Sequence, residues 1–180
     1  MRNPLILLLV IAMLPACTPT TDTDYAEPGT GGEVLYRSPG ANYSLGDDFA
    51  YLNQEGDTII SAGANTYSFT DTLTHYAILG TNDELFAINA EGDRLYEVYV
   101  YDNGPDYLQE GLFRILRNEQ IGYADATGQI VIEPQFACAE PFEDGKARVA
   151  LDCTLNSDGE HTTMESDEWF YIDRSGEKIE

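Results

Sequence analysis

The chain has 180 residues, of which 32 are Asp or Glu and 9 are Lys or Arg, so its formal net charge is −23 at pH 7. So acidic a chain is not expected to bind nucleic acid or an anionic lipid surface, because phosphate groups need a positively charged partner. Its length suits a single domain with a real core. Three explanations of the acidity stay open: a well-solvated surface, a saline habitat, and a cationic partner or bound divalent ions.

The N-terminus has the pattern of a bacterial lipoprotein signal. A short charged start, Met1-Arg2-Asn3, precedes an apolar run from Leu5 to Leu14. That run is too short to span a bilayer and suits the apolar part of a signal peptide. It ends in Leu14-Pro15-Ala16-Cys17, which resembles a lipobox. We therefore expect residues 1–16 to be removed and Cys17 to carry lipid. An ordinary signal peptide cleaved elsewhere and a buried helix are the alternatives.

The segment after Cys17 is rich in Thr, Asp, Pro and Gly and has almost nothing to bury. Residues 17–32, the lipidated cysteine included, are therefore predicted to be a flexible tether. Lipid and tether would place residues 33–180 at the bacterial cell envelope. We expect the outer membrane, with the domain facing either the periplasm or the cell surface.

Four short stretches of this domain share one pattern, in which Asn or Asp stands three residues before a Gly. They are FAYLNQEGDTI from Phe49, LFAINAEGDRL from Leu85, IGYADATGQIV from Ile121 and WFYIDRSGEKI from Trp169. The glycines are Gly56, Gly92, Gly128 and Gly176, with spacings of 36 (92 − 56), 36 (128 − 92) and 48 (176 − 128). A fixed period predicts a repeat architecture, with twelve residues inserted in the last interval (48 − 36).

Asn or Asp followed by Gly at this spacing favours a hairpin turn. The side-chain oxygens of Asn53, Asn89, Asp125 and Asp173 can accept hydrogen bonds from the turn backbone, and Gly tolerates the positive φ that the turn needs. A hairpin around the first turn pairs Tyr51 with Ile59, on one face with Phe49. We expect the equivalent face of every copy to be the core: Phe49, Tyr51, Ile59; Leu85, Ala87, Leu95; Ile121, Tyr123, Val131; and Trp169, Tyr171, Ile179. The opposite face is mixed and is expected to be partly solvated.

A third strand is predicted after each hairpin, in GLFRIL from Gly111, GKARVA from Gly145 and THYAIL from Thr74. GEVLYR from Gly32 is a similar segment that precedes the first hairpin, so the chain is expected to be permuted by part of a unit. The predicted fold is all-β, with about four antiparallel meander units of three strands and roughly 36 residues each.

Residues 122–150, GYADATGQIVIEPQFACAEPFEDGKARVA, resemble the WG repeat family, also called KWG. The resemblance lies in Gly-Tyr-x-Asp, Val-Ile-x-Pro-x-Phe and Pro-Phe-x-x-Gly-x-Ala-x-Val, and WFYIDRSGEKI is similar to the start of another copy. The first two copies lack the Ile-x-Pro element, and Ala87 replaces the Tyr. The resemblance implies a β-repeat domain over residues 33–180, of a kind often found in envelope lipoproteins and without shared catalytic residues.

Two cysteines remain when Cys17 carries lipid. Cys138 and Cys153 are expected on consecutive strands, nearly opposite each other around a turn at residues 143–146. In an oxidising compartment they are predicted to form a disulfide. By the chain-entropy argument, closing a loop of 15 residues (153 − 138) contributes up to about 3 kcal/mol. Buried free thiols are the alternative.

No residue pattern predicts catalysis, because the chain has 2 His and lacks the common nucleophile, phosphate-binding and zinc motifs. The inserted segment places Asn156, Asp158 and Glu165 at positions 3, 5 and 12 of a calcium-loop pattern that starts at Thr154. Position 1 is Thr where the pattern has Asp, and no helices are expected on either side. A plain hairpin excursion is therefore the favoured interpretation, with no cofactor, and Ca²⁺ is the lesser alternative.

The aromatic strand from Leu95 to Tyr101 is another candidate for binding. Its tyrosines could stack on sugar rings if they were exposed, although a strand that is apolar on both faces is more typical of burial.

These patterns predict a non-enzymatic binding module that presents a β-repeat surface to a protein or a glycan. A purely structural lipoprotein and, less favoured, an enzyme are the alternatives. A glycan site should show exposed, coplanar aromatic rings, and an enzyme needs a concave pocket with converging polar groups. Any ligand is expected at the variable segments Asp102–Glu110 and Asp152–Asp167, because long loops on a repeat scaffold usually carry function.

Overall fold

The computed structural model describes residues 25–26, 31–157 and 162–179. Within these ranges the chain forms nineteen β-strands and no helix, so the all-β prediction is confirmed. A helix long and apolar enough to cross a membrane is not found in this part of the chain. The predicted signal peptide, Cys17 and Asp158 lie outside the described residues.

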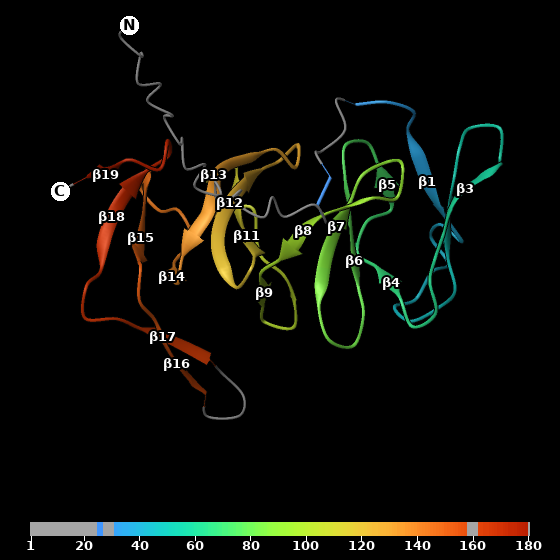
Figure 1. Cartoon of the computed structure of the whole chain (residues 1–180). Helices are drawn as coiled ribbons and strands as arrows, with labels where there is room; N and C mark the ends of the chain where they lie inside the picture. Colours follow the sequence, from blue (N-terminus) through green and yellow to red (C-terminus); the bar gives the residue numbers. More distant parts are fainter. Residues whose placement is uncertain (1–24, 27–30, 158–161, 180) are drawn as a thin grey trace, which may run out of the picture.

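Twelve of the strands form four antiparallel meanders, which we call units 1 to 4 (Figure 1). Unit 1 consists of β1 (Leu35–Ser38), β2 (Ala50–Leu52) and β3 (Thr58–Ser61), unit 2 of β6 (Ala77–Gly80), β7 (Leu85–Ile88) and β8 (Arg94–Val98), unit 3 of β11 (Leu112–Arg117), β12 (Gln120–Asp125) and β13 (Ile130–Phe136), and unit 4 of β15 (Lys146–Ala150), β18 (Phe170–Asp173) and β19 (Lys178–Ile179). The number of units agrees with the prediction. Each strand that was expected to complete a hairpin is the first strand of the meander after it, so unit 1 begins with β1 and no unit is permuted. β11 also pairs with β8, as predicted for that copy, and this pairing joins units 2 and 3 in one seven-stranded sheet.

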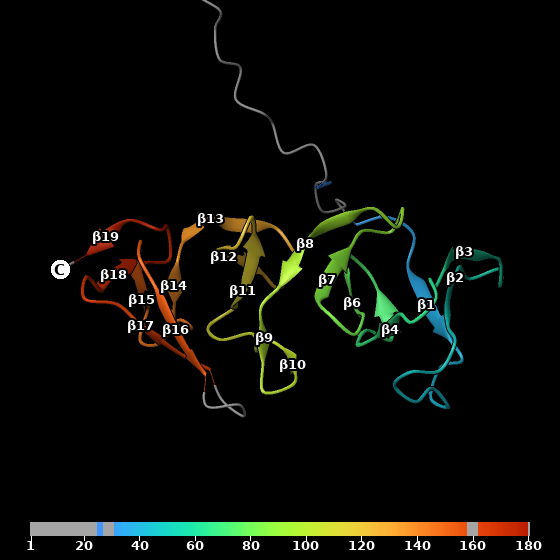
Figure 2. The same cartoon turned by 60° about the horizontal axis from the view of Figure 1, so that its bottom comes forward.

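The remaining strands belong to the connections between units and to one insertion. β4 (Tyr67–Ser68) and β5 (Thr72–Leu73) connect units 1 and 2, β9 (Val100–Tyr101) and β10 (Gly104–Pro105) connect units 2 and 3, and β14 (Cys138–Ala139) connects units 3 and 4. The insertion, within unit 4, is the hairpin of β16 (Thr154–Ser157) and β17 (Thr162–Glu165). Figures 1 and 2 show the units following one another in an open array, with unit 1 at one end and unit 4 at the other.

All four predicted turns form. In each, the Gly amide donates to the Asn or Asp carbonyl oxygen at 2.9–3.2 Å, and the Gly φ lies between +83° and +89°. The side chain takes part as well: Asn53 Oδ1 accepts from the Asp57 amide at 2.8 Å, and Asp125 Oδ1 accepts from the Thr127 amide at 2.8 Å. These hydrogen bonds stabilise a backbone conformation that Gly adopts without strain.

The pairing across three of the four hairpins differs from the prediction by one residue. The observed pairs are Tyr51–Ile60, Ala87–Tyr96 and Tyr123–Ile132, each beside a register shift. The shift is a β-bulge, in which one extra residue on the second strand is left unpaired. Ile59 and Val131 were therefore wrongly assigned to the core, and they are 45% and 42% exposed. Unit 4 keeps the predicted pairing of Tyr171 with Ile179.

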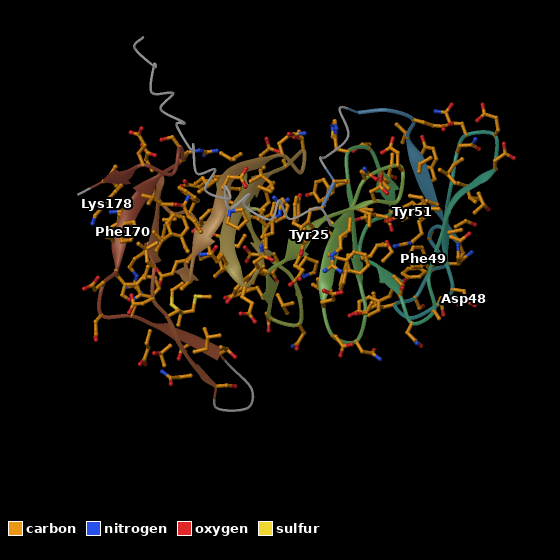
Figure 3. All side chains as sticks on the ribbon, in the orientation of Figure 1. Tyr25, Asp48, Phe49, Tyr51, Phe170 and Lys178 are labelled. Carbon is orange, nitrogen blue, oxygen red and sulfur yellow. A yellow bond between two sulfur atoms is a disulfide. The ribbon has the colours of Figure 1, made fainter. Side chains whose placement is uncertain are left out.

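Three clusters of buried side chains form the core, one between each pair of neighbouring units. Tyr51 packs in one cluster with Leu79, Ala87 in the second with Ile115, and Tyr123 in the third with Val149. Figure 3 shows Phe49 and Tyr51 on the side of unit 1 that faces unit 2. The prediction of a solvated second face is wrong for the inner units, where Ile88 and Ala124 are buried. These residues are buried because each inner unit is stacked between two neighbouring units, which cover both of its faces.

Unit 4 has the same residue pattern, but no further unit follows it in the described chain. The face that packs on the next unit in units 1 to 3 carries Trp169 and Tyr171 in unit 4. Tyr171 is 37% exposed and Trp169 is partly exposed, whereas Ile172 on the opposite face is 1% exposed. The assignment of Trp169 and Tyr171 to the core is therefore wrong. Arg148 and Lys146 cover the two rings instead, with cation-to-centroid distances of 4.3 and 4.5 Å.

Two residues of the expected tether contact the array. The Ala26 amide donates to Arg94 O at 2.7 Å, and the Arg117 guanidinium carbon lies 4.8 Å from the centre of the Tyr25 ring. Arg94 belongs to unit 2 and Arg117 to unit 3, so the segment crosses the seam between these units, where Figure 3 labels Tyr25. The tether is thus not free of contacts at these two residues.

Because Ile172 is buried and Tyr171 is not, the two side chains should contribute differently to stability. Ile172→Ala leaves a cavity and is expected to lower the free energy of unfolding by about 2–5 kcal/mol. Tyr171→Ala is expected to cost less than about 1 kcal/mol, the scale of one exposed cation–π contact. Urea unfolding followed by circular dichroism measures both, and equal losses would contradict this assignment of the faces.

Candidate functional site

Two hairpins project from the same side of the array (Figures 1 and 2). β9–β10 lies between units 2 and 3, and β16–β17 extends from unit 4. β10 and β16–β17 belong to the two stretches in which the sequence predicted binding, Asp102–Glu110 and Asp152–Asp167, whereas β9 lies just before the first stretch. The structure brings these stretches together at one open cleft of about 1000 Å³.

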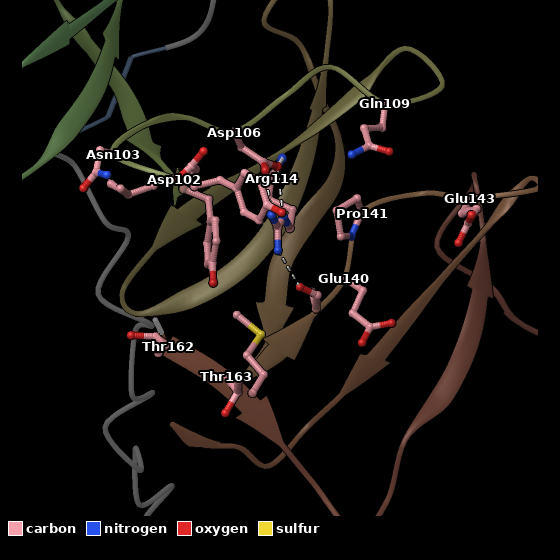
Figure 4. Close-up of a pocket in the computed structure, with 15 residues that line it drawn as sticks. Asp102, Asn103, Asp106, Gln109, Arg114, Glu140, Pro141, Glu143, Thr162 and Thr163 are labelled. Atoms are coloured by element: carbon pink, nitrogen blue, oxygen red, sulfur yellow. Dashed lines mark hydrogen bonds and ion pairs between the residues drawn. The ribbon is translucent and has the colours of Figure 1, made fainter. Parts of the chain in front are cut away.

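The cleft has two walls and a floor, shown in Figure 4. One wall runs from Tyr99 to Asn103, and the other from Thr162 to Met164. Arg114, Ala139 and Glu140 lie at the floor. The walls thus come from sequence positions about 60 residues apart, whereas the floor comes from unit 3 and from its connection to unit 4.

A buried ion pair forms part of the floor. Arg114 Nη2 donates to Asp106 Oδ1 at 2.6 Å and Arg114 Nε donates to Asp106 Oδ2 at 2.9 Å, with the two side chains only 5% and 2% exposed. The Arg114 amide donates to Asp106 Oδ2 at 2.8 Å, and Arg114 Nη1 donates to Ala139 O at 3.1 Å. The guanidinium carbon also lies 4.0 Å from the centre of the Tyr99 ring. A bidentate pair with this many partners fixes the loop of Asp106 and strand β14 relative to β11.

Burial and pairing set the charge states at the floor. Burial alone would lower the pKa of Arg114, but the hydrogen bonds and ion pair with Asp106 outweigh it and raise that pKa above its ordinary value. Burial also raises the pKa of Tyr99 and of Tyr123, whose hydroxyl donates to Glu140 O at 2.6 Å. At neutral pH the charged arginine of the floor therefore lies near two neutral tyrosines, Tyr99 in the first wall and Tyr123 in the core.

Sequence reasoning missed this ion pair, although a signal for it exists. Asp106 precedes Arg114 by eight residues, and Glu140 precedes Arg148 by eight and also pairs with it, with Arg148 Nε 3.0 Å from Glu140 Oε2. Before unit 2, Thr70 stands at the position of the acid. Its Oγ1 accepts a hydrogen bond from the amide of Ile78, eight residues later, at 2.9 Å. An acid eight residues before the Arg of Gly-x-apolar-Arg could have indicated the pair.

Four large apolar side chains are exposed in the first wall of the cleft or next to it, and we call them the rim patch: Val100, Tyr101, Tyr107 and Leu108, with exposed fractions of 49–57%. The aromatic strand predicted over residues 95–101 is thus buried at Leu95, Tyr96 and Val98 and exposed at its end. The rings of Tyr101 and Tyr107 are 5.7 Å apart with an interplanar angle of 70°. They do not form the coplanar platform expected of a glycan site.

The predicted disulfide between Cys138 and Cys153 is present, with the Cα atoms 5.3 Å apart. The two residues are not direct neighbours in the ladder, because Cys138 pairs with Ala150 and Cys153 lies where the chain leaves β15 for the insertion. The bond therefore attaches the base of β16–β17 to β14. Across the same base, Ser166 Oγ donates to Asp152 Oδ1 at 2.7 Å.

The described part of the insertion is a hairpin. Thr154 pairs with Glu165 and Asn156 with Thr163 along a regular ladder, whereas a calcium loop would curl around its ion between two helices. Among the residues outside the uncertain ranges, no group of three or more His, Cys, Asp or Glu could hold a metal ion. The predicted hairpin is thus present at Asn156 and Glu165, whereas Asp158, the remaining residue of the calcium-loop pattern, lies outside the described residues.

A chain of small meanders that bury their sheets by stacking is a β-repeat protein. Residues 121–152 match the family described as WG containing repeat, so this segment of the array is a WG repeat. Within the matched segment, Tyr123, Phe136, Phe142 and Val149 all belong to the core cluster between units 3 and 4, so the match covers a stacking contact. No curated protein and no solved structure matched the chain.

The ion pair at the floor generates a stability prediction. Asp106→Asn leaves the buried Arg114 charge without its partner and is expected to cost about 3–5 kcal/mol of unfolding free energy. Asp102→Asn, which removes an exposed carboxylate from the same loop, should stay within about 0.5 kcal/mol. Parallel urea titrations of the two variants measure the difference, and a mild effect of Asp106→Asn would show that the pair does not fix the floor.

Proposed function

We propose that the protein is a non-enzymatic binding module, held at the bacterial envelope by lipid on Cys17, which captures a protein partner between β9–β10 and β16–β17. The observation that carries the proposal is the meeting of two separate excursions from the array at one open cleft, with the rim patch beside it. Ligand sites are concave and combine apolar surface with a few placed polar groups.

The rim patch favours a protein as the partner. Single exposed apolar side chains are common, but four on one short loop, two of them tyrosines, resemble the clusters that carry binding energy in protein interfaces. The rings of Tyr101 and Tyr107 already contact each other edge to face. Their side chains would therefore lose little conformational entropy when a partner binds. A glycan is the second candidate, and the inclination of the rings gives it less support.

Covalent and ionic contacts fix both walls in advance of binding. The Asp106–Arg114 pair holds the first wall, and the Cys138–Cys153 disulfide holds the base of the second. A preorganised site loses less conformational entropy when a ligand binds. This rigidity supports recognition over a purely structural role. An enzyme has the least support, because the floor carboxylates Asp106 and Glu140 are each paired with an arginine.

The proposal of a lipid anchor rests on the N-terminal sequence. The contact of residues 25–26 with the array limits how far the array can lie from that anchor. Figure 2 shows that contact on the side of the array away from the two hairpins. Eight residues lead from Cys17 to Tyr25 (25 − 17), and a chain of that length spans at most about 30 Å. A lipid on Cys17 would therefore hold the seam between units 2 and 3 close to the membrane, with the cleft directed away from it.

The anchor is tested by Cys17→Ala. Wild type is expected to incorporate a fatty-acid probe and to fractionate with membranes, whereas the variant has no thiol to acylate and should do neither. Equal membrane association of the two proteins would contradict lipidation at this residue.

The binding surface is tested by photo-cross-linking in cells. A photoreactive amino acid at Leu108 is expected to give a discrete product with a protein partner. The same amino acid at Leu45, which is 61% exposed in unit 1, should not give that product.

Deletion of residues 154–165 is the matched structural variant, because Thr154 and Glu165 are neighbours in the ladder and the chain can be rejoined at the base. The deletion should remove the Leu108 product and leave the array folded, with a small loss of melting temperature because it also removes the contact of Met164 with the core. A product that forms equally at Leu45, or that survives the deletion, would count against the cleft.

A further inference from the structure

The two strands that face the cleft each have an open edge. In the described ranges β9 pairs only with β10, and β17 pairs only with β16. Val100, Tyr101 and residues 162–164 line the cleft, and no described residue of β10 or β16 does so. The paired strands thus stand behind β9 and β17, and the cleft lies between two open edges. At its base β17 touches β14, where Glu165 O is 3.8 Å from Cys138 Sγ, so residues 162–164 are the open part of this edge.

An open edge presents backbone N–H and C=O groups that can pair with another strand, and many proteins bind extended peptides in this way. Natural edges that must not pair are protected in several ways, among them Pro or Lys on the strand. β13, at the edge of the seven-stranded sheet, contains Pro134. β9 and β17, with the sequences Val-Tyr and Thr-Thr-Met-Glu, contain neither residue and are rich in residues that favour strands.

The charges around the cleft favour a basic ligand. Among the described residues, its lining includes the carboxylates of Asp102, Asp106, Glu140 and Glu143 and the single cation Arg114. Asp106 is paired with Arg114 and Glu140 with Arg148, so the exposed Asp102 and Glu143 are left to meet a ligand. Figure 4 shows these two carboxylates at opposite ends of the cleft. The net charge of −23 adds a long-range attraction for cations.

We propose that the cleft binds an extended, basic peptide segment of the partner protein as an added strand between β9 and β17. The backbone of the segment pairs with the open edges, and its Lys or Arg side chains on one face reach Asp102 and Glu143. Alternate side chains point the other way, as in any strand. The inference rests on the proposed function, because it uses the same cleft, and it adds the chemistry of the partner and the mode of binding.

The probe is a fluorescent peptide of alternating Lys and Thr, titrated by anisotropy against the full chain purified in detergent. One matched peptide has Glu in place of Lys. Another keeps the Lys–Thr sequence but carries an N-methyl group on every second backbone nitrogen, which removes hydrogen-bond donors and preserves the charge. We expect the first peptide to bind, and both matched peptides to bind at least about tenfold more weakly.

Charge variants separate the cleft from the net charge of the protein. Asp102→Asn with Glu143→Gln removes two carboxylates from the cleft, and Asn tolerates the φ of +48° at position 102. Asp83→Asn with Glu91→Gln removes two exposed carboxylates from the turns of unit 2. The first double variant is expected to lose about tenfold in affinity, whereas the second should bind as wild type does.

Each contrary outcome overturns a different part of the inference. Equal losses in the two double variants would show that net charge, and not the cleft, attracts the peptide. Equal binding of the N-methylated peptide would exclude strand addition. If no peptide binds while the cross-link at Leu108 still forms, the basic-strand inference fails and the proposed function stands.

Discussion

Units 1 to 3 each present a row of apolar side chains to the unit that follows, and this stacking contact is the interaction on which the rest of the structure depends. Tyr51, Ala87 and Tyr123 occupy the same place in consecutive units, and all three are fully buried against the next unit. A lone sheet of three short strands buries too little apolar surface to offset the conformational entropy that its residues lose. The stability of a unit is therefore shared with its neighbours, as in other repeat proteins.

The stacking contact also positions the connections between units. The Tyr51 hydroxyl donates to Thr70 O and the Tyr123 hydroxyl donates to Glu140 O, both at 2.6 Å, and each acceptor lies in the connection to the next unit. Buried hydroxyl groups need such partners. In unit 2, which has Ala87 at this place, the equivalent connection is held by the Asp106–Arg114 pair. The floor of the cleft is thus the local form of a contact that recurs along the array.

The turns and the disulfide could be predicted because they depend on local residue types. Asn53 with Gly56 suits one kind of turn, whatever packs around it. The register could not be predicted, because each bulge falls at two successive apolar residues, Ile59-Ile60, Leu95-Tyr96 or Val131-Ile132, and alternation does not distinguish them. The same limit applies to Tyr171 and Ile172. Both are apolar neighbours, and which of them is buried depends on what stacks against unit 4.

The sequence predicted both segments that form the cleft. It did not predict that they lie close together, because their separation in space depends on how the units stack. The reason that they can form one site lies in the core. Tyr99 of the first wall and Met164 of the second both pack against the cluster between units 3 and 4, to which Tyr123 and Val149 also belong. The rim patch residues, in contrast, are members of no core cluster among the described residues. The walls thus share the rigidity of the stacking contact, while the residues that would meet a partner can vary without cost to the fold. A change that loosens the contact between units 3 and 4 should therefore weaken binding even though it touches no ligand, because it lets the two walls move relative to each other.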